Sequence, residues 1–286
     1  MRWTSGRRSD NVEDQRELGS SGRKMKGGGI GILLLALVGM YFGIDPSLIL
    51  NSNLGGGGPA LQSSNQVTHT NPAEDKLADF VSVVLADTED TWGKIFQDAG
   101  ARYEKPKLVL FTGQVQSACG FAQSATGPFY CPADRKVYID LGFYDELKRN
   151  LNAPGDFAQA YVIAHEIGHH VQNLLGIDKK IQAKRASLSQ VDYNKLSVKL
   201  ELQADCFAGV WAFHANRMRN ILEPGDVEEA LNAASMIGDD TLQKKSQGYV
   251  VPDSFTHGSS KERVRWFRQG LTGGDIRQCN TFNQSM

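Results

Sequence analysis

The sequence predicts an α+β protein that is mainly helical. Most of the chain after residue 74 carries apolar residues at helical spacing, whereas two stretches, 107–115 and 136–141, have the β-branched and aromatic residues of strands. The chain of 286 residues suits one globular domain of about 200 residues behind a tail. Its net charge of −1 leaves no electrostatic footprint for nucleic acid, so we expect no such partner.

Three segments precede the predicted domain, which spans residues 74–286. Residues 1–26 are polar and of mixed charge, which is typical of a disordered tail. Residues 27–44 carry no charge, and a helix of this length rises about 27 Å, close to the hydrocarbon thickness of a bilayer. Residues 45–73 are rich in Gly, Ser and Asn and predict a flexible linker.

The uncharged run 27–44 predicts an uncleaved transmembrane signal-anchor. A cleaved signal peptide would need small residues in an Ala-x-Ala pattern after the run, and Asp45-Pro46-Ser47 offers none. A buried soluble helix is disfavoured by the many glycines. The basic flank predicts a cytoplasmic N-terminus. We therefore expect a single-pass protein of the cytoplasmic membrane with a periplasmic or otherwise extracytoplasmic domain.

The elements of the domain follow from periodicity and from capping and stop signals. Gly100 and Gly176 are helix stops, and Asp156 and Ser259 or Ser260 are helix caps. In chain order we expect a helix over 75–100, a strand over 107–115, a loop to residue 132, a strand over 136–141, a helix over 156–175, largely helical structure over 181–220, a helix over 227–237, and a last helix after residue 260.

The predicted helix 156–175 contains His165-Glu166-Ile167-Gly168-His169. Positions i and i+4 share a helix face, so both imidazoles can bind one metal ion with Glu166 beside them as general base. A solvated helix with two histidines is the alternative. The preceding residues 157–164 are mostly apolar, however, and buried histidines need the compensation that a cation provides. His170 points elsewhere on the helix, and we expect it to contact a neighbouring segment.

A catalytic zinc site usually takes three protein ligands. The metzincin string would place a histidine at position 175 and glycine at 172, but Leu175 and Gln172 stand there, which excludes that string. Downstream, Glu201 and Asp205 are i and i+4 and face one way. Adjacent acids repel unless a positive group lies beside them. Glu201 on the metal and Asp205 on a ligand ring N–H would meet this need, and a solvated acidic face is the alternative.

These motifs resemble the gluzincin arrangement and, from about Lys76 onward, the bacterial family called putative neutral zinc metallopeptidases. The matching pieces are residues 161–172, residues 201–209, and Thr256-His257-Gly258-Ser259-Ser260 with Arg263 after it. The resemblance implies a zincin-like domain with a small sheet over the metal-binding helix. It also implies one Zn²⁺ per chain held by His165, His169 and Glu201, with Glu166 as catalytic base.

The resemblance further implies that an edge strand of the sheet lines the substrate site. Residues 137–141 are the candidate edge, to which a peptide could add as an extra strand. An ordinary hairpin strand is the alternative.

The predicted function is a zinc-dependent metalloendopeptidase acting on peptides or proteins of the cell envelope. Glu166 would act as general base on a zinc-bound water, with Asp205 orienting a ligand histidine. His257 is the first candidate for stabilising the oxyanion, followed by Tyr161 and Arg263, although His257 could be an ordinary loop histidine. The alternatives are a zinc-stabilised scaffolding module that does not hydrolyse and an amidase of cell-wall peptides.

Four cysteines form an even set without a C-x-x-C spacing, which fits disulfides in an exported domain. Three pairings are possible. A short glycine-containing loop favours Cys119–Cys131, and the remaining pair is then Cys206–Cys279.

Overall fold

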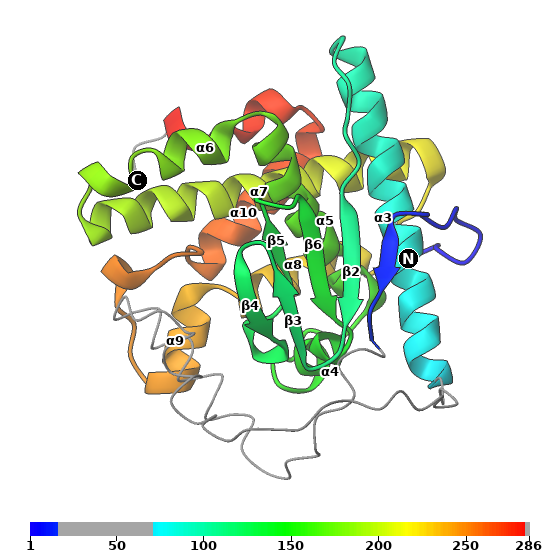
Figure 1. Cartoon of the computed structure of the whole chain (residues 1–286), viewed down its shortest axis with the longest axis horizontal. Helices are drawn as coiled ribbons and strands as arrows, with labels where there is room; N and C mark the ends of the chain where they lie inside the picture. Colours follow the sequence, from blue (N-terminus) through cyan, green and yellow to red (C-terminus); the bar gives the residue numbers. More distant parts are fainter. Residues whose placement is uncertain (17–70, 284–286) are drawn as a thin grey trace, which may run out of the picture.

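The computed structural model describes residues 1–16 and 71–283, and its α+β, mainly helical class is the one predicted (Figure 1). The described strands are β1 (Val12–Asp14), β2 (Lys107–Phe111), β3 (Gln114–Ser117), β4 (Gly120–Gln123), β5 (Phe129–Cys131) and β6 (Lys136–Asp140). The described α-helices are α3 (Pro72–Asp98), α4 (Gly142–Arg149), α5 (Asp156–Leu174), α6 (Ile177–Gln182), α7 (Gln190–Arg219), α8 (Asp226–Met236), α9 (Asp239–Gln247) and α10 (Ser260–Gly273).

Four strands form one sheet in the order β1-β2-β6-β5. β1, β2 and β6 run parallel, and β5 is antiparallel to β6. The parallel strand β2 is buried from Leu108 to Phe111, which explains its continuous apolar run. The predicted strand 107–115 is wrong in one respect, because it divides at Gly113 (φ +79°), and β3 pairs with β4 in a separate hairpin.

The expectation that residues 137–141 form the sheet edge is also wrong. β6 lies between β2 and β5, with Val137 paired to Leu108 on one side and to Tyr130 on the other. The residues of β5 were expected to be loop, and they take the position outside β6. In the described sheet, β5 is therefore the edge on that side.

The helix α5 is the centre of the core, buried nearly throughout, and packs against α7 and α8 behind the sheet (Figure 1). It crosses α7 closely at Gly168, where a Cβ would lie 2.9 Å from the Ala204 carbonyl oxygen. α7 in turn meets α10 at Gly270, where a Cβ would lie 2.0 Å from the Cys206 carbonyl oxygen. Because glycine stands at these crossings, the three helices approach closely next to the predicted metal ligands.

The helices agree with prediction in place more than in number. α5 and α8 occupy the expected ranges, whereas the stretch 181–220 is divided, because Ser189 caps α7 by accepting a hydrogen bond from the Asp192 N–H at 3.1 Å. The short helices α4 and α9 were not predicted. In α10 the cap is Ser259, whose side chain forms a capping box with Glu262.

The expectation of a disordered tail is wrong for residues 1–16. β1 joins the sheet, with Glu13 paired to Val109. Arg8 forms an ion pair with Asp79 of α3 at 2.6 Å, and the Trp3 ring packs edge-on against Phe80 with centroids 5.3 Å apart. The charges that suggested disorder in the isolated segment have partners on α3.

No helix within residues 1–16 and 71–283 is long and apolar enough to cross a membrane. The predicted anchor 27–44 and all but the end of the predicted linker 45–73 lie outside the described residues.

Candidate metal centre

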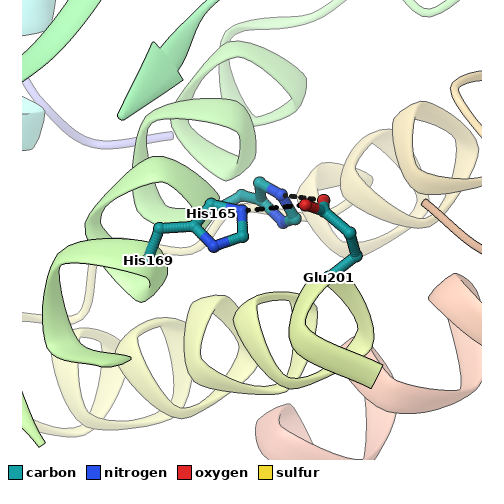
Figure 2. A group of neighbouring side chains, drawn as sticks. All are labelled: His165, His169 and Glu201. Carbon is teal, nitrogen blue, oxygen red and sulfur yellow. Dashed lines mark hydrogen bonds and ion pairs between the residues drawn. The ribbon is translucent and has the colours of Figure 1, made fainter. Parts of the chain in front are cut away.

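The structure brings His165, His169 and Glu201 together, with both imidazoles directed at one carboxylate (Figure 2). The His165 Nε2 lies 3.2 Å from Glu201 Oε2, and the His169 Nε2 lies 3.4 Å from Glu201 Oε1. Ligand atoms bound tetrahedrally to zinc at about 2.0–2.1 Å are about 3.3 Å from one another. Each nitrogen lies at about this spacing from one oxygen of the Glu201 carboxylate, and one ligand atom from each of the three residues lies within 4.8 Å of the others, which suits a shared zinc ion.

Asp205 contacts the His165 ring at Nδ1, the nitrogen that does not face Glu201. Its Oδ1 lies 2.8 Å from His165 Nδ1, which leaves Nε2 for a metal. Asp205 is fully buried, and Arg263, which is 3% exposed, donates to Oδ2 from Nε at 2.8 Å and to Oδ1 from Nη2 at 2.9 Å. Burial alone would raise the pKa of Asp205, but Arg263 and His165 lower it to about 2. Asp205 is thus paired with His165, one of the two histidines expected to bind the metal.

Gln172 holds the other ring, and sequence reasoning missed it. Its Oε1 lies 2.9 Å from His169 Nδ1, so His169 also presents Nε2. The amide stands three residues after the histidine on the same helix, and that spacing is the signal that could have revealed it. His170 contacts a neighbouring segment as expected, with Nε2 2.6 Å from the Glu104 carbonyl oxygen.

The carboxylates of the site attract positive charge, which protons on the histidine rings supply when no metal ion is bound. Although burial opposes a charged ring, Asp205 and Glu201 raise the pKa of His165 to about 10. Burial would raise the pKa of Glu201, but His169 and His165 keep it well below its usual value. In the metal-free site an ionised carboxylate therefore faces rings that tend to be protonated, and a metal ion would have to displace the protons at Nε2. Burial raises the pKa of Glu166 above its usual range, which suits a group that must accept a proton.

His257 lies beside this cluster on a loop built around Asp239. The backbone N–H groups of Thr256, His257 and Gly258 donate to Asp239 Oδ2 at 2.8, 2.7 and 2.9 Å. The ring Nδ1 lies 3.2 Å from Asp239 Oδ1, and the side chain is 45% exposed. The partial burial of the ring lowers the pKa of His257, but Asp239 and the nearby charge of Glu201 outweigh it and raise the pKa above its usual value.

Unlike His257, Tyr161 and Arg263 have no exposed side chain that could reach a substrate. Tyr161 is fully buried and donates its hydroxyl to Asp205, and the guanidinium of Arg263 is bound to the same carboxylate. Of the three candidates for oxyanion stabilisation, His257 is the one with an exposed side chain. Asp239, which fixes it, gave no signal in the sequence because it lies on the unpredicted helix α9.

Both predicted disulfides are present, Cys119–Cys131 and Cys206–Cys279. Cys206 follows Asp205 on α7, and Cys279 belongs to the C-terminal segment after α10. This second bond therefore holds the end of the described chain beside the candidate metal centre.

A second group of acids, Asp156, Asp226 and Glu229, lies at the start of α5 and α8. The α-amino group of Met1 is 2.6 Å from Asp156 Oδ1 and 3.3 Å from Asp226 Oδ1. An ammonium thus supplies positive charge there, and we assign no metal to this group.

Comparison with known proteins agrees with this centre. A family model described as "Putative neutral zinc metallopeptidase" matches residues 1–282, so the similarity extends to β1 and beyond the region quoted above. A protein of Escherichia coli strain K12 with the printed name "Uncharacterized protein YpfJ" is 51% identical over 295 residues, covering 100% of both chains. "Uncharacterized protein Rv2575" of Mycobacterium tuberculosis strain H37Rv is 40% identical over 216 residues, covering 71% of each. No solved structure matches the chain.

Proposed function

Because the chain belongs to the family of putative neutral zinc metallopeptidases, we propose that it is a zinc-dependent endopeptidase, with His165, His169 and Glu201 as the ligands of one Zn²⁺. The observation that carries this proposal is the approach of both Nε2 atoms to one carboxylate at 3.2 and 3.4 Å, with Glu166 next to His165 on the same helix. A purely structural zinc site closes all four positions with protein ligands and has no use for a buried base.

When bound, the zinc ion would supply Lewis acidity, which polarises a peptide carbonyl and makes water a better nucleophile. Glu166 would take the proton from the attacking water and deliver it to the leaving amine. Asp205 and Gln172 hold the two ligand rings with Nε2 forward. Arg263 keeps Asp205 ionised, so that the carboxylate remains an acceptor for the His165 N–H.

His257 would hydrogen-bond to the oxyanion that develops on the substrate carbonyl. Its contacts among the described residues use Nδ1, and Asp239 holds the ring in place. Replacing His257 with alanine should lower kcat about 10²–10³-fold, which is the typical loss on removing one oxyanion donor. Zinc content should stay unchanged.

Steady-state kinetics with a quenched peptide, together with metal analysis, checks this role. His214→Ala is the matched control, because that ring bonds the Gly274 carbonyl at 2.8 Å and contacts none of the ligands. Wild-type turnover in His257→Ala with zinc in place would show that His257 is an ordinary loop histidine.

We place the active domain outside the cytoplasm, acting on peptides or proteins of the cell envelope. The two disulfides support this location, because such bonds persist in oxidising compartments.

Cleavage of casein and of a peptide library by the purified full chain tests the function. Activity should disappear with a zinc chelator and return with added Zn²⁺. A chain that binds zinc but cleaves no peptide would favour the scaffolding alternative, and cleavage confined to cell-wall peptides would favour the amidase.

A further inference from the structure

A chain of buried amides connects the ligand His169 to the C-terminal segment. Gln172 is 1% exposed and Gln203 is 5% exposed, yet the amide groups of both have hydrogen-bond partners. Buried amides without partners would be costly, so such a chain is held in one arrangement. It has no part in the chemistry described above beyond the contact of Gln172 with His169.

The direction of every bond in this chain is fixed by backbone carbonyls. The Cys279 carbonyl can only accept, so Gln203 presents its Nε2 there at 2.9 Å and turns Oε1 toward Gln172. Gln172 then donates from Nε2 to Gln203 Oε1 at 3.1 Å and to the Leu200 carbonyl at 2.7 Å. Its Oε1 is left to accept the Nδ1–H of His169, whose Nε2 is therefore unprotonated in the neutral ring.

We propose that Gln172 and Gln203 are positioning residues that set the ring tautomer of His169 for zinc binding. This series of hydrogen bonds starts at the Cys279 carbonyl. The fully buried Cys206–Cys279 disulfide holds that carbonyl in place. Because Cys206 adjoins Asp205, the same disulfide borders the supports of both ligand histidines. The segment after α10 thereby acts on the metal centre without touching the metal.

This proposal rests on the proposed zinc site, and zinc affinity measured against a competing chelator tests it. Gln172→Met, which keeps the length of the side chain without the amide, should weaken zinc binding about 10–100-fold, as is typical for partners of ligand histidines. Gln203→Met should weaken it less, because the Leu200 carbonyl still orients Gln172. Gln203→Glu should also weaken it, since a carboxylate cannot donate to Cys279.

Gln97→Met, at an exposed position of α3, is the matched control and should bind zinc like the wild type. Thermal unfolding of the zinc-free proteins separates a general loss of stability from a change at His169. Wild-type zinc affinity in both Gln172→Met and Gln203→Glu would overturn the positioning role and leave the zinc site standing. Absence of zinc binding in the wild type would overturn both.

A different observation concerns residues 1–16. β1 pairs with β2, and Glu13 forms ion pairs with Lys107 at 2.8 Å and Lys136 at 2.7 Å. Arg16, the last described residue before the gap, lies with Nη2 3.3 Å from Asp75 Oδ1 at the start of α3. Residue 16, before the gap, and the start of α3, after it, therefore lie side by side.

From these contacts we infer that residues 1–16 and residues 71–283 lie on the same side of the membrane. A bilayer with a hydrocarbon core about 30 Å thick would separate β1 from β2 if the chain crossed it once between them. The inference replaces the predicted arrangement of a cytoplasmic tail and a periplasmic domain. The inference holds whether the shared side is the cytoplasm or the space outside it.

Labelling of a single introduced cysteine shows on which side of the membrane its position lies. The native cysteines do not interfere, because all four are in disulfides. Full chains with Ser5→Cys or Ser246→Cys, both at exposed positions, are treated in intact and in permeabilised cells with a maleimide that cannot cross membranes. Both positions should react under the same condition. Reaction of one in intact cells and of the other only after permeabilisation would overturn the inference.

Discussion

Replacing Glu166 with glutamine should lower kcat about 10²–10⁴-fold while one zinc per chain stays bound. The amide keeps the shape of the side chain and lacks the basic oxygen that accepts a proton. Glu166 is buried, burial raises its pKa, and it sits between the two ligand histidines in sequence on α5. Because His165, His169 and Glu201 are unchanged, metal binding should survive.

Metal analysis and peptide kinetics on the same preparations measure both quantities. Glu228→Gln, at an exposed position of α8, is the matched control and should keep wild-type turnover. If Glu166→Gln hydrolyses peptides at the wild-type rate, another group is the base. If it loses zinc as well as activity, the kinetic loss says nothing about a base, and Glu166 has a structural role instead.

Replacing Arg263 with methionine should destabilise the fold by about 3–5 kcal/mol, the usual cost of leaving one member of a buried ion pair alone. Asp205 is fully buried and receives two hydrogen bonds from Arg263. Without the guanidinium, Asp205 must be ionised without its main counter-charge or take up a proton. In either state it supports His165 less well, so zinc affinity should also fall.

Chemical denaturation of the zinc-free protein measures this effect. Arg277→Met removes an exposed ion pair with Asp275 and should leave the midpoint unchanged. Adding Asp205→Asn to Arg263→Met should restore part of the stability, because it removes the unpaired charge. Equal midpoints for Arg263→Met and the wild type would show that this pair contributes nothing to the fold.

The pH dependence of the same pair has a definite sign. The pKa of Asp205 is lowered to about 2 in the folded protein, so the ionised pair stabilises the fold above the usual aspartate pKa. That contribution is lost as the pH falls from about 4 toward about 2. The deficit of Arg263→Met relative to the wild type should therefore narrow over this interval, because the unpaired Asp205 of the variant becomes neutral first.

The predictable part of the site is the part that local periodicity controls. His165 and His169 share a face of α5, and Glu201 and Asp205 share a face of α7, because each pair is four residues apart. The meeting of these two faces was inferred from charge and from the family resemblance. The close crossing at Gly168 is what makes it possible.

The parts that were missed depend on contacts between distant segments. β1 is stabilised by β2 and α3, and no pattern within residues 1–16 predicts those partners. Gln203 takes its role from the Cys279 carbonyl, seventy-six residues away in sequence. β6 became an inner strand because the three residues of β5, too few to give an alternating pattern, pair beside it.

The zinc content of the purified full chain, compared with that of His165→Ala/His169→Ala, tests the central claim most directly. We expect one zinc per wild-type chain and none in the double variant, with the variant still folded by circular dichroism, because Arg263 continues to pair with Asp205 without the metal. Wild-type chains without zinc, or equal zinc in both proteins, would contradict the assignment of this centre.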